Sequence, residues 1–523
     1  MRQRPAMLRR LSLISASLAL TATARADATG EEAAPVDGLL RSIDAFFGQW
    51  IVSPLESVLF YDLWFWDNGQ ENDTKLPVIV AWLVVGAVFF TFRYRFPNVR
   101  ALGHALRVTR GDFDSDDDPG EVSHFQALAS ALSATVGLGN IAGVAVAVQM
   151  GGPGAVFWMV VAAFFGMCSK FSECTLGQVY REVDAKGHVS GGPMRYLSRG
   201  LAEMGFARLG RALAILFAIM CVGGSLGGGN MFQANQSYAQ VAGVLPIFEG
   251  GGGKVVYGLF LACLVGAVII GGIKRIGMVA GYIVPVMCGV YLVGGLIVLG
   301  AHAGDLGAAF AKIVTEAFAP TAVGGGAVGV LMIGFQRAAF SNEAGVGSAS
   351  IAHSAAATDE PVREGIVALL EPFIDTILVC TMTGLVVVIT GAYASGDEGV
   401  AMTSSAFDTV IPGFRYVLSF AVFMFAFSTM ISWSYYGERC WTYLFGPRAS
   451  LAYKLLFLCF VVLGAVLELG NVIGFSDLMI LGMAFPNILG MYFLSGKVKT
   501  LFEDYWARLK SGQMAPTRSR ETA

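Results

Sequence analysis

Long apolar runs with almost no charge are the feature that most limits what this chain can fold into. The runs near 254–273 and 277–300 are each long enough to cross a bilayer core as a helix. Of the 523 residues, 55% are hydrophobic and only 14% are charged, whereas soluble domains carry about a quarter charged residues. Soluble domains could not cover so many apolar residues, and a disordered chain would be richer in charge. The sequence therefore predicts an all-α membrane protein with many spans.

Eleven stretches after residue 75 are long enough to span a membrane. They lie near 76–93, 122–148, 154–180, 209–243, 254–273, 277–300, 325–352, 364–391, 412–440, 451–468 and 474–496. With residue 27 outside, the segments on the cytoplasmic side hold 23 Lys and Arg residues and those on the outer side hold five. This positive-inside bias predicts an extracytoplasmic N-terminus and a cytoplasmic C-terminus.

The N-terminal region has two features of its own. Residues 1–26 have the pattern of a signal peptide, with four arginines, an apolar run at 11–20 and an A-x-A cleavage site at 24–26. A short uncleaved anchor is the alternative. Apolar residues recur at helical spacing over 42–65, but acidic residues interrupt them. This pattern favours an amphipathic segment in the membrane interface over a further span.

Two of the predicted spans contain a glycine-rich interruption. The second contains Ser133–Gly143, centred on Val136-Gly137-Leu138-Gly139-Asn140, and the seventh contains Phe340–Ala349, with the similar run Ala344-Gly345-Val346-Gly347-Ser348. Each glycine costs about 1 kcal/mol of helix propensity, so both spans are predicted to be broken; close packing of small residues is the alternative. Five spans begin with each broken helix. Because five is an odd number, the second set enters from the opposite side, as in the 5+5 inverted repeat of secondary transporters.

A broken helix leaves free backbone N–H groups on one half and free carbonyls on the other. The N–H groups attract a carboxylate and the carbonyls attract a cation, so a zwitterionic amino acid and Na⁺ fit the two poles. Neither interruption contains a Gly-Lys-Ser/Thr phosphate-binding signature, and the formal net charge is only −3. The sequence therefore gives no reason to expect a nucleotide, an organic cofactor or a nucleic-acid partner.

At these residues the chain resembles the alanine/glycine:cation symporter family, the sodium:alanine symporters, which share the fold of the bacterial leucine transporter. The resemblance extends over roughly 40–500, and its most specific runs are 133–145, 151–159, 191–196, 233–235, 340–349 and 433–438. It implies Na⁺-coupled, less often H⁺-coupled, uptake of alanine or glycine by alternating access in a bacterial inner membrane. A channel would need a continuous polar pore and is the alternative of a different class. No cluster typical of an enzyme is found in the sequence.

The resemblance also implies a substrate site between the two breaks. The residues expected to bind the amino acid are Thr135, Leu138, Gly139, Asn140, Gln233, Phe340, Ser341 and Trp433. Amides of the first break would bind the carboxylate, carbonyls of both breaks would bind the ammonium group, and the two aromatic residues would exclude large side chains. For the glutamine, an ordinary interhelical hydrogen bond is the alternative.

A cation site is expected where the first broken helix meets the ninth span. Carbonyls of Ser133 and Val136 and hydroxyls of Ser428 and Thr429 would give Na⁺ a shell of uncharged oxygens. Hydroxyl groups in helices often bond a carbonyl of their own helix instead, which is the alternative.

Charged residues within the spans are a further signal, because at this depth they face a cavity or each other. Lys170 and Glu173 are three residues apart, Glu371 and Asp375 are four apart, and Arg337 and Glu343 flank the second break. They are interpreted as gating pairs or, for the residues near 371–375, as a site of proton coupling; a neutralised structural network is the alternative. The conformational candidates are Gly137, Arg337, Glu343, Gly345, Glu371 and Asp375. Of these, Glu343 lies within the second interruption and is expected to hold the break open.

These features predict the organisation of the chain. The predicted parts are the signal peptide (1–26), an extracytoplasmic amphipathic segment (27–75), a first transmembrane helix with a cytoplasmic loop (76–121), two five-helix repeats (122–300 and 325–496) and a cytoplasmic tail (497–523). The expected partners are a small neutral amino acid, Na⁺ and the lipid bilayer.

Overall fold

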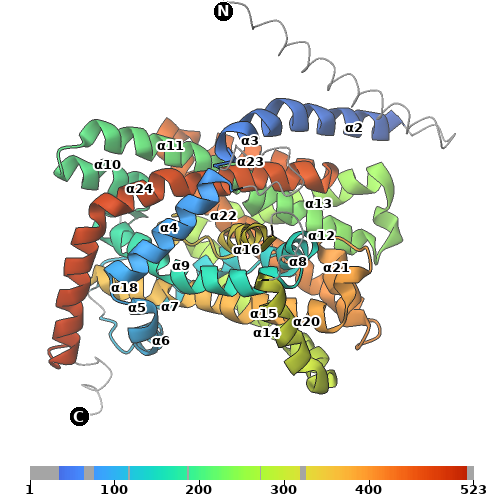
Figure 1. Ribbon diagram of the computed structural model, residues 1–523. Coiled ribbons are helices and arrows are strands. Elements are labelled where there is room, and N and C mark those ends of the chain that lie inside the picture. Colours follow the sequence, from blue (N-terminus) through green and yellow to red (C-terminus); the bar gives the residue numbers. More distant parts are fainter. Residues whose placement is uncertain are drawn as a thin grey trace, which may run out of the picture.

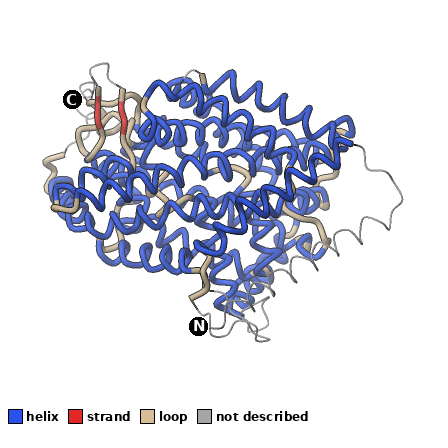
Figure 2. Tube along the Cα trace, turned by 90° about the horizontal axis from the view of Figure 1, so that it is seen from above, coloured by secondary structure: helices blue, strands red, loops and turns tan. Residues whose placement is uncertain are grey.

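The computed structural model describes residues 35–63, 76–115, 118–184, 188–270, 272–318 and 326–514. The predicted signal peptide lies outside these ranges. Figure 2 shows a chain that is almost entirely helical. In the described ranges the one sheet is a small antiparallel hairpin of β1 (Glu182–Val183) and β2 (Val189–Ser190).

Helices form at each predicted span. They are α4 (Val78–Arg93), α7 (His124–Thr135) with η2 (Gly139–Gly143) and α8 (Val144–Gly151), α9 (Gly154–Val179), α11 (Ala207–Leu226) with η3 (Gly227–Met231) and α12 (Phe232–Ala242), α13 (Gly250–Ile269), α14 (Gly272–Ala301), α16 (Gly326–Asn342) with α17 (Ala349–His353), α18 (Pro361–Ala368) with α19 (Leu370–Pro372), η6 (Phe373–Cys380) and α20 (Thr381–Ile389), α22 (Phe414–Phe445), α23 (Ser450–Val466) and α24 (Leu469–Lys510).

Other helices precede or connect these. They are α2 (Pro35–Phe47), η1 (Gly48–Val52), α3 (Ser53–Leu59), α5 (Pro97–Arg100), α6 (Leu102–Thr109), α10 (Pro193–Glu203), η4 (Pro246–Phe248), η5 (Ala303–Asp305), α15 (Leu306–Phe318), η7 (Ala392–Ala394), α21 (Val400–Asp408) and η8 (Pro447–Ala449).

Within the described ranges, eight helices are long and apolar enough to cross a membrane, and the pair α7–α8, bent by 51°, makes nine. The helices α4 and α16 have 16 and 17 residues and do not reach the length of a full span. The chain is thus a many-helix membrane protein. The count of eleven spans and the inverted repeat stay predictions.

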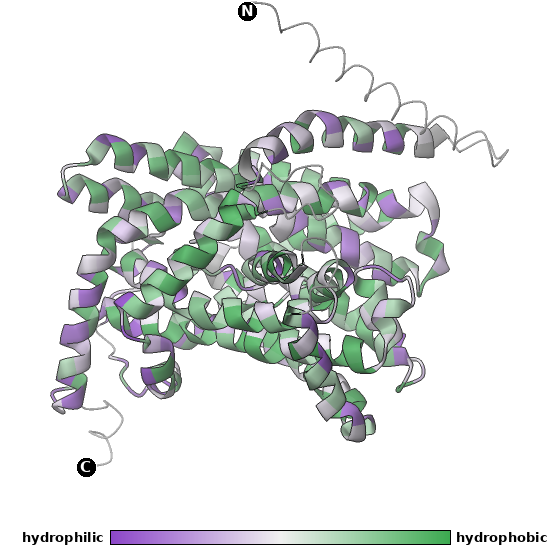
Figure 3. Cartoon of the chain, in the orientation of Figure 1, coloured by the Kyte–Doolittle hydropathy of each residue, from purple (hydrophilic) through white to green (hydrophobic). Residues whose placement is uncertain are grey.

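The bundle has two distinct ends. In Figure 1, α6, the start of α18 and the last turns of α24 lie at the left, while α15, α20 and α21 lie at the right. The small β-hairpin lies at the left as well, near the C-terminus, in Figure 2. We call these the hairpin end and the α21 end. Figure 3 shows α4 as almost uniformly hydrophobic and the last turns of α24 as largely hydrophilic, so the hairpin end projects polar surface.

The N-terminal segment forms a bent helix that docks on the start of α24. The rings of Phe47 and Phe475 lie 5.2 Å apart, edge to face. Asp44 accepts hydrogen bonds from the backbone N–H of Glu468, at 2.9 Å, and from the side chain of Asn471, at 2.8 Å. Trp50 is exposed on the opposite face, as in an amphipathic helix that keeps one apolar face for the membrane interface.

Two helices lie in segments that the sequence analysis left as connections. In α15, Ala309, Ile313 and Ala317 are buried at a spacing of four residues and form one apolar face, which packs against α9. The helix α21 buries Thr403, whose hydroxyl donates to the carbonyl of Ile141 at 3.1 Å. These helices are stabilised by contacts with distant elements, which local spacing does not show.

Candidate substrate and cation site

The first break begins where α7 ends at Thr135. Over the next three residues the chain is not helical, and it resumes as the π-helical turn η2. In the non-helical residues, Gly137 N donates to Asn140 Oδ1 at 2.9 Å, and Leu138 N donates to Gln233 Oε1 at 3.2 Å. Every residue from Thr135 to Gly143 is buried. The predicted interruption is therefore present, and Gln233 contacts it directly.

The second break lies between α16 and α17. Glu343 follows the last residue of α16 and has a φ of 56°, while Gly345 and Gly347 have φ of 83° and 100°. A left-handed conformation costs a side-chain-bearing residue about 1–2 kcal/mol, so Glu343 is held there by its surroundings. One oxygen of its carboxylate accepts from Trp433 Nε1 at 2.9 Å and the other accepts from the Ser348 hydroxyl. These contacts hold the glutamate beside the unwound backbone, and its role in keeping the break open stays a prediction.

One buried carboxylate joins the two breaks. Asp375, in the π-helical segment η6, accepts from Asn140 Nδ2 at 2.7 Å and from the Ser341 hydroxyl at 2.9 Å. The Thr376 hydroxyl donates to it at 2.6 Å. A Cβ atom built on Gly139 would lie 3.3 Å from the Cα of Ser341, so the first break lies against the last turn of α16, just before the second break. Short π-helical segments of this kind often lie at functional sites.

Aromatic side chains close the sides of this region. Phe340 packs edge to face against Phe232, with ring centroids 5.1 Å apart, and the guanidinium of Arg337 lies 5.4 Å from the centroid of the Phe340 ring. Trp433 packs against the backbone of Gly229, where a Cβ atom would collide with the indole. The glycine run 227–229 in η3 thus makes room for both rings. The sequence analysis did not single out this run, although three consecutive glycines within a span were its visible signal.

Uncharged oxygens meet at the predicted cation site. The Thr429 hydroxyl donates to the carbonyl of Ser133 at 3.1 Å, and the Ser133 hydroxyl donates to the carbonyl of Ser428 at 2.9 Å. Ser432, which the sequence analysis missed, donates to the Ser133 hydroxyl at 2.9 Å. The Ser428 hydroxyl donates to the carbonyl of Phe425 in its own helix. Val136 directly follows α7 and is buried in the same break. Hydroxyl and carbonyl oxygens without a carboxylate suit a monovalent cation better than a divalent one, which favours carboxylate ligands.

The intramembrane charges pair differently from their sequence spacing. Arg337 forms an ion pair with Asp477 of α24, which is buried, and not with Glu343. Lys170 Nζ lies 3.0 Å from Glu371 Oε2, so its ion pair joins α9 to α19. Glu371 and Asp375 do not act as a pair, because the aspartate binds the two breaks and the glutamate faces Lys170. Helical spacing showed that these groups share a face, but it did not show which group lies opposite.

The proposed substrate amides are partly engaged within the protein. Leu138 N donates to Gln233, and Asn140 N donates to the carbonyl of Gly137 at 3.2 Å. The Thr135 hydroxyl donates to the carbonyl of Ala131 in its own helix. The structure therefore gathers the predicted substrate residues around the two breaks, with Gln233 next to the first and Trp433 next to the second.

Comparisons with known proteins identify the family of the chain. A profile described as the sodium:alanine symporter family matches residues 67–519. The sodium/alanine symporter AgcS of Methanococcus maripaludis is 41% identical over 430 residues, covering 81% of this chain and 92% of that protein. The probable sodium/glutamine symporter GlnT of Bacillus subtilis is 33% identical over 454 residues, with coverage of 85% and 91%. Among solved structures, MhsT in complex with L-phenylalanine aligns with 72% of this chain and 99% of its own at 15% identity and a TM-score of 0.46. The chain belongs to the sodium:alanine symporter family and is a multi-pass membrane transporter.

Proposed function

We propose that this protein is a secondary active transporter that couples the uptake of alanine or glycine to Na⁺ by alternating access. The observation that carries the proposal is the contact between the two breaks through Asp375, because it brings free helix ends of opposite polarity to one place. Family membership supports the coupling ion and the substrate class, since AgcS is named as a sodium/alanine symporter.

We assign the amino acid to the space between the breaks. Its carboxylate would bind the amides of Leu138, Gly139 and Asn140, and Gln233 belongs to the site because its side-chain oxygen reaches one of these amides. The ammonium group would lie near the carbonyls of Thr135, Phe340 and Ser341, and the hydroxyl of Ser341 also donates to the carboxyl group of Asp375.

Phe340 and Trp433 would limit the size of the substrate side chain. Both side chains are buried, and both pack against glycines of η3. A Cβ atom at these glycines would collide with the aromatic ring or have little room beside it. A pocket with such walls rejects a large side chain by overlap more strongly than it rejects a missing methyl group. This supports alanine or glycine over the glutamine named for the relative GlnT.

We place Na⁺ between Ser133, Val136, Ser428 and Thr429, where the first broken helix meets α22. The ion would then tie a segment that unwinds to a helix that stays continuous, so binding of Na⁺ favours one packing of these two elements. A cation that binds one state better than another shifts the equilibrium by the ratio of the two affinities. This is the physical basis on which a Na⁺ gradient drives uptake.

We place the hairpin end in the cytoplasm and the N-terminal segment outside, in a bacterial inner membrane. The support is the distribution of Lys and Arg, 23 against five over the connecting segments. On the outer side, a cavity of about 780 Å³ is lined by residues that include Glu56 of α3, Gln336 of α16 and Asp477 of α24. Gln336 Nε2 and Arg337 both donate to Asp477. We take this cavity as the outer route toward the site, because Asp477 of the buried ion pair is among its lining residues.

The direct test is uptake of labelled alanine into proteoliposomes under an imposed Na⁺ gradient or an imposed H⁺ gradient. We expect saturable accumulation against the alanine gradient with Na⁺, competition by glycine, and weak competition by glutamine. Accumulation with the H⁺ gradient alone would establish the H⁺-coupled alternative. Flux that does not saturate and cannot be driven uphill would establish the channel.

A variant locates the site. In Gly139→Leu the new side chain would meet the backbone of Ser341, so we expect uptake to fall to background while the protein still inserts. Gly281→Leu in α14 is the matched control, because no atom lies within 4 Å of the position of its Cβ. Normal uptake by Gly139→Leu contradicts the assignment of the site to the contact between the breaks.

A further inference from the structure

Within the described ranges, seven lysine, glutamate and histidine side chains are buried together between the second break and the hairpin end. They are Lys170 and Glu173 of α9, Glu343 of the break, His124 of α7, His353 of α17, Glu364 of α18 and Glu371 of α19. We call them the carboxylate–histidine cluster. The four carboxylates outnumber the one lysine, and a net negative charge remains even with both imidazole rings charged. Because a buried net charge is very unfavourable, this packing is stable only when the cluster holds additional protons.

Five members form a continuous chain of contacts. His124 Nδ1 faces one oxygen of Glu364, and His353 Nδ1 faces the other. His353 Nε2 faces Oε1 of Glu371, and Oε2 of Glu371 lies 3.0 Å from Lys170 Nζ. Each imidazole of this series therefore contacts a carboxylate, and each imidazole–carboxylate contact can carry a proton.

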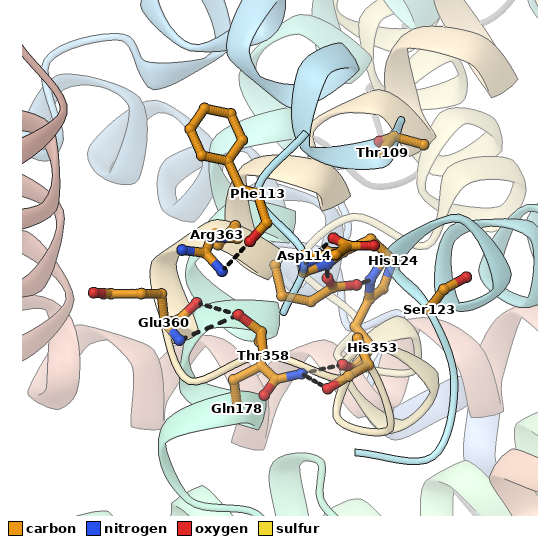
Figure 4. Close-up of polar contacts among 12 residues, drawn as sticks. Thr109, Phe113, Asp114, Ser123, His124, Gln178, His353, Thr358, Glu360 and Arg363 are labelled. Atoms are coloured by element: carbon orange, nitrogen blue, oxygen red, sulfur yellow. Dashed lines mark hydrogen bonds and ion pairs between the residues drawn. The ribbon is translucent and has the colours of Figure 1, made fainter. Parts of the chain in front are cut away.

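The series of contacts reaches the hairpin end at His124. His124 is buried, but its Nε2 atom lies 3.8 Å from Asp114 Oδ1, and the Asp114 side chain is 42% exposed. Figure 4 shows Asp114 beside His124, with His353 below His124 in this view. Among the described residues, His124 Nε2 and Glu173 Oε1 have no hydrogen-bond partner. A buried carboxylate oxygen and a buried ring nitrogen without a donor or acceptor mark positions where a further proton can bind.

The other charged groups nearby that the structure describes do not neutralise the cluster. Arg363 Nη1 lies 3.9 Å from Asp118 and 3.7 Å from Asp359, so its charge is met by these aspartates. Arg181 donates to four backbone carbonyls, including those of Ser354 and Ala356. On the inner side the cluster is faced by Cys174 of α9 and Tyr436 of α22, neither of which supplies a positive charge.

A metal ion does not fit this cluster as well as protons do. Ligand atoms of Cys174, His353 and Glu371 lie within 4.8 Å of one another. However, both nitrogens of His353 already face carboxylate oxygens, and Lys170 lies against Glu371. An imidazole can ligate a metal only through a free nitrogen lone pair, so metal binding would require this chain of contacts to be broken.

We propose that the carboxylate–histidine cluster is a proton-binding site loaded from the cytoplasm, through which internal protons regulate Na⁺-driven transport. The proposal rests on the proposed function and on the orientation given above. A proton from water binds His124 Nε2, and the ring passes its Nδ1 proton to Glu364. Glu364 passes a proton to His353 Nδ1, and His353 passes its Nε2 proton to Glu371. One proton leaves the solution and one arrives beside Lys170, so the charges balance.

The direction of the effect follows from the burial of the cluster. In the packed arrangement, extra protons neutralise the carboxylates; an arrangement that admits cytoplasmic water lets the carboxylates ionise. The packed arrangement therefore binds more protons and is favoured at low internal pH. Because opening toward the cytoplasm must separate α17 and α18 from α9 to reach the second break, internal acid slows uptake and internal alkali accelerates it. One linked proton changes an equilibrium by at most about tenfold per pH unit.

Right-side-out membrane vesicles allow the two sides to be tested separately, because they keep the native orientation. Alanine uptake driven by a fixed Na⁺ gradient is measured while the internal pH is varied from about 6 to about 8, the range in which histidine titrates. The external pH is then varied with the internal pH held constant. We expect the rate to rise several-fold with internal pH and to change less than about twofold with external pH.

Variants identify the groups responsible. His124→Gln and the exposed Asp114→Asn are expected to transport alanine with a weakened dependence on internal pH. The matched control is His104→Gln, since this histidine lies at the same end but bonds Tyr505 and not the cluster; its dependence should match the unmodified protein. The proposal is overturned if the uptake rate of the unmodified protein does not depend on internal pH. It is also overturned if the dependence on internal pH is unchanged in both Asp114→Asn and His124→Gln. Absence of Na⁺-driven uptake at every pH would instead refute the proposed function.

Discussion

Replacing Gly137 by alanine adds one methyl group at the point where the first break meets α22. The new Cβ atom would lie 3.3 Å from Gln233 Oε1 and 3.3 Å from Thr429 Cβ, and closer still to the Thr429 hydroxyl. That hydroxyl donates to the carbonyl of Ser133 at 3.1 Å. The methyl group can be accommodated only if the threonine side chain turns away. The substitution therefore acts on one of the oxygens assigned to Na⁺.

The size of the effect follows from the cost of overpacking. An extra methyl group in a well-packed interior costs about 1–3 kcal/mol, and about 1.4 kcal/mol corresponds to a tenfold change in an equilibrium constant. If the strain is relieved by moving Thr429, the same energy is lost from Na⁺ binding. We therefore expect the Na⁺ concentration that gives half-maximal alanine uptake to rise about tenfold or more.

The assay is the Na⁺ dependence of alanine uptake at a fixed alanine concentration. Gly143→Ala is the matched control within the same interrupted helix, because Gly143 has a helical φ of −64° and its Cβ would come no closer than 4.0 Å to the Leu138 carbonyl. An unchanged Na⁺ requirement in Gly137→Ala would refute the placement of Na⁺ beside Thr429. An equal increase in Gly143→Ala would show that the effect comes from the helix and not from the site.

Two further predictions concern stability. Asp44→Ala removes the carboxylate that accepts from the backbone N–H of Glu468, the residue before α24. We expect a loss of about 1 kcal/mol, as for a helix cap, visible as a lower Tm with uptake retained. Ser42→Ala is the control, because the Ser42 hydroxyl bonds a carbonyl of its own helix, and it should leave the Tm unchanged. Burial of His104 in α6, reinforced by Arg107 and Arg363, lowers its pKa to about 4. The folded protein therefore binds this proton less readily than the unfolded chain, and stability should fall as pH drops from about 6.5 to about 4. Thermal unfolding of purified protein should show a smaller decrease over this range in His104→Gln, and an identical decrease in both proteins would refute this assignment.

The positions of the long apolar helices and of both breaks could be predicted from the sequence because their signals are local. Apolar run length determines a span, and the glycines at 137, 139, 345 and 347 lower helix propensity at the place where the helix stops. The left-handed conformation of Glu343 was not predictable, since glutamate does not favour it and only contacts with Ser348 and Trp433 hold it.

The pairing of the charged groups could not be predicted, because it depends on residues far apart in the chain. His124 and Glu364 are 240 positions apart, and Arg337 and Asp477 are 140 apart. Helical period identifies which residues share a face of one helix, but not which face of another helix lies opposite. For the same reason the sequence does not show that His124 and His353 contact the same glutamate, Glu364.

The contact between Asn140 and Asp375 has a consequence for how this protein is made. The two residues are separated by 235 positions, so the ribosome completes the first before the second enters the membrane. Until then the Asn140 amide and the Lys170 ammonium lie in lipid without the carboxylates that they bind in the folded protein, at a cost of several kcal/mol for the charge. Early helices therefore have a reason to stay beside the insertion machinery until the later ones arrive. A truncated chain that ends before Asp375 should be recognised by membrane quality-control proteases, whereas the two pieces made together should protect each other.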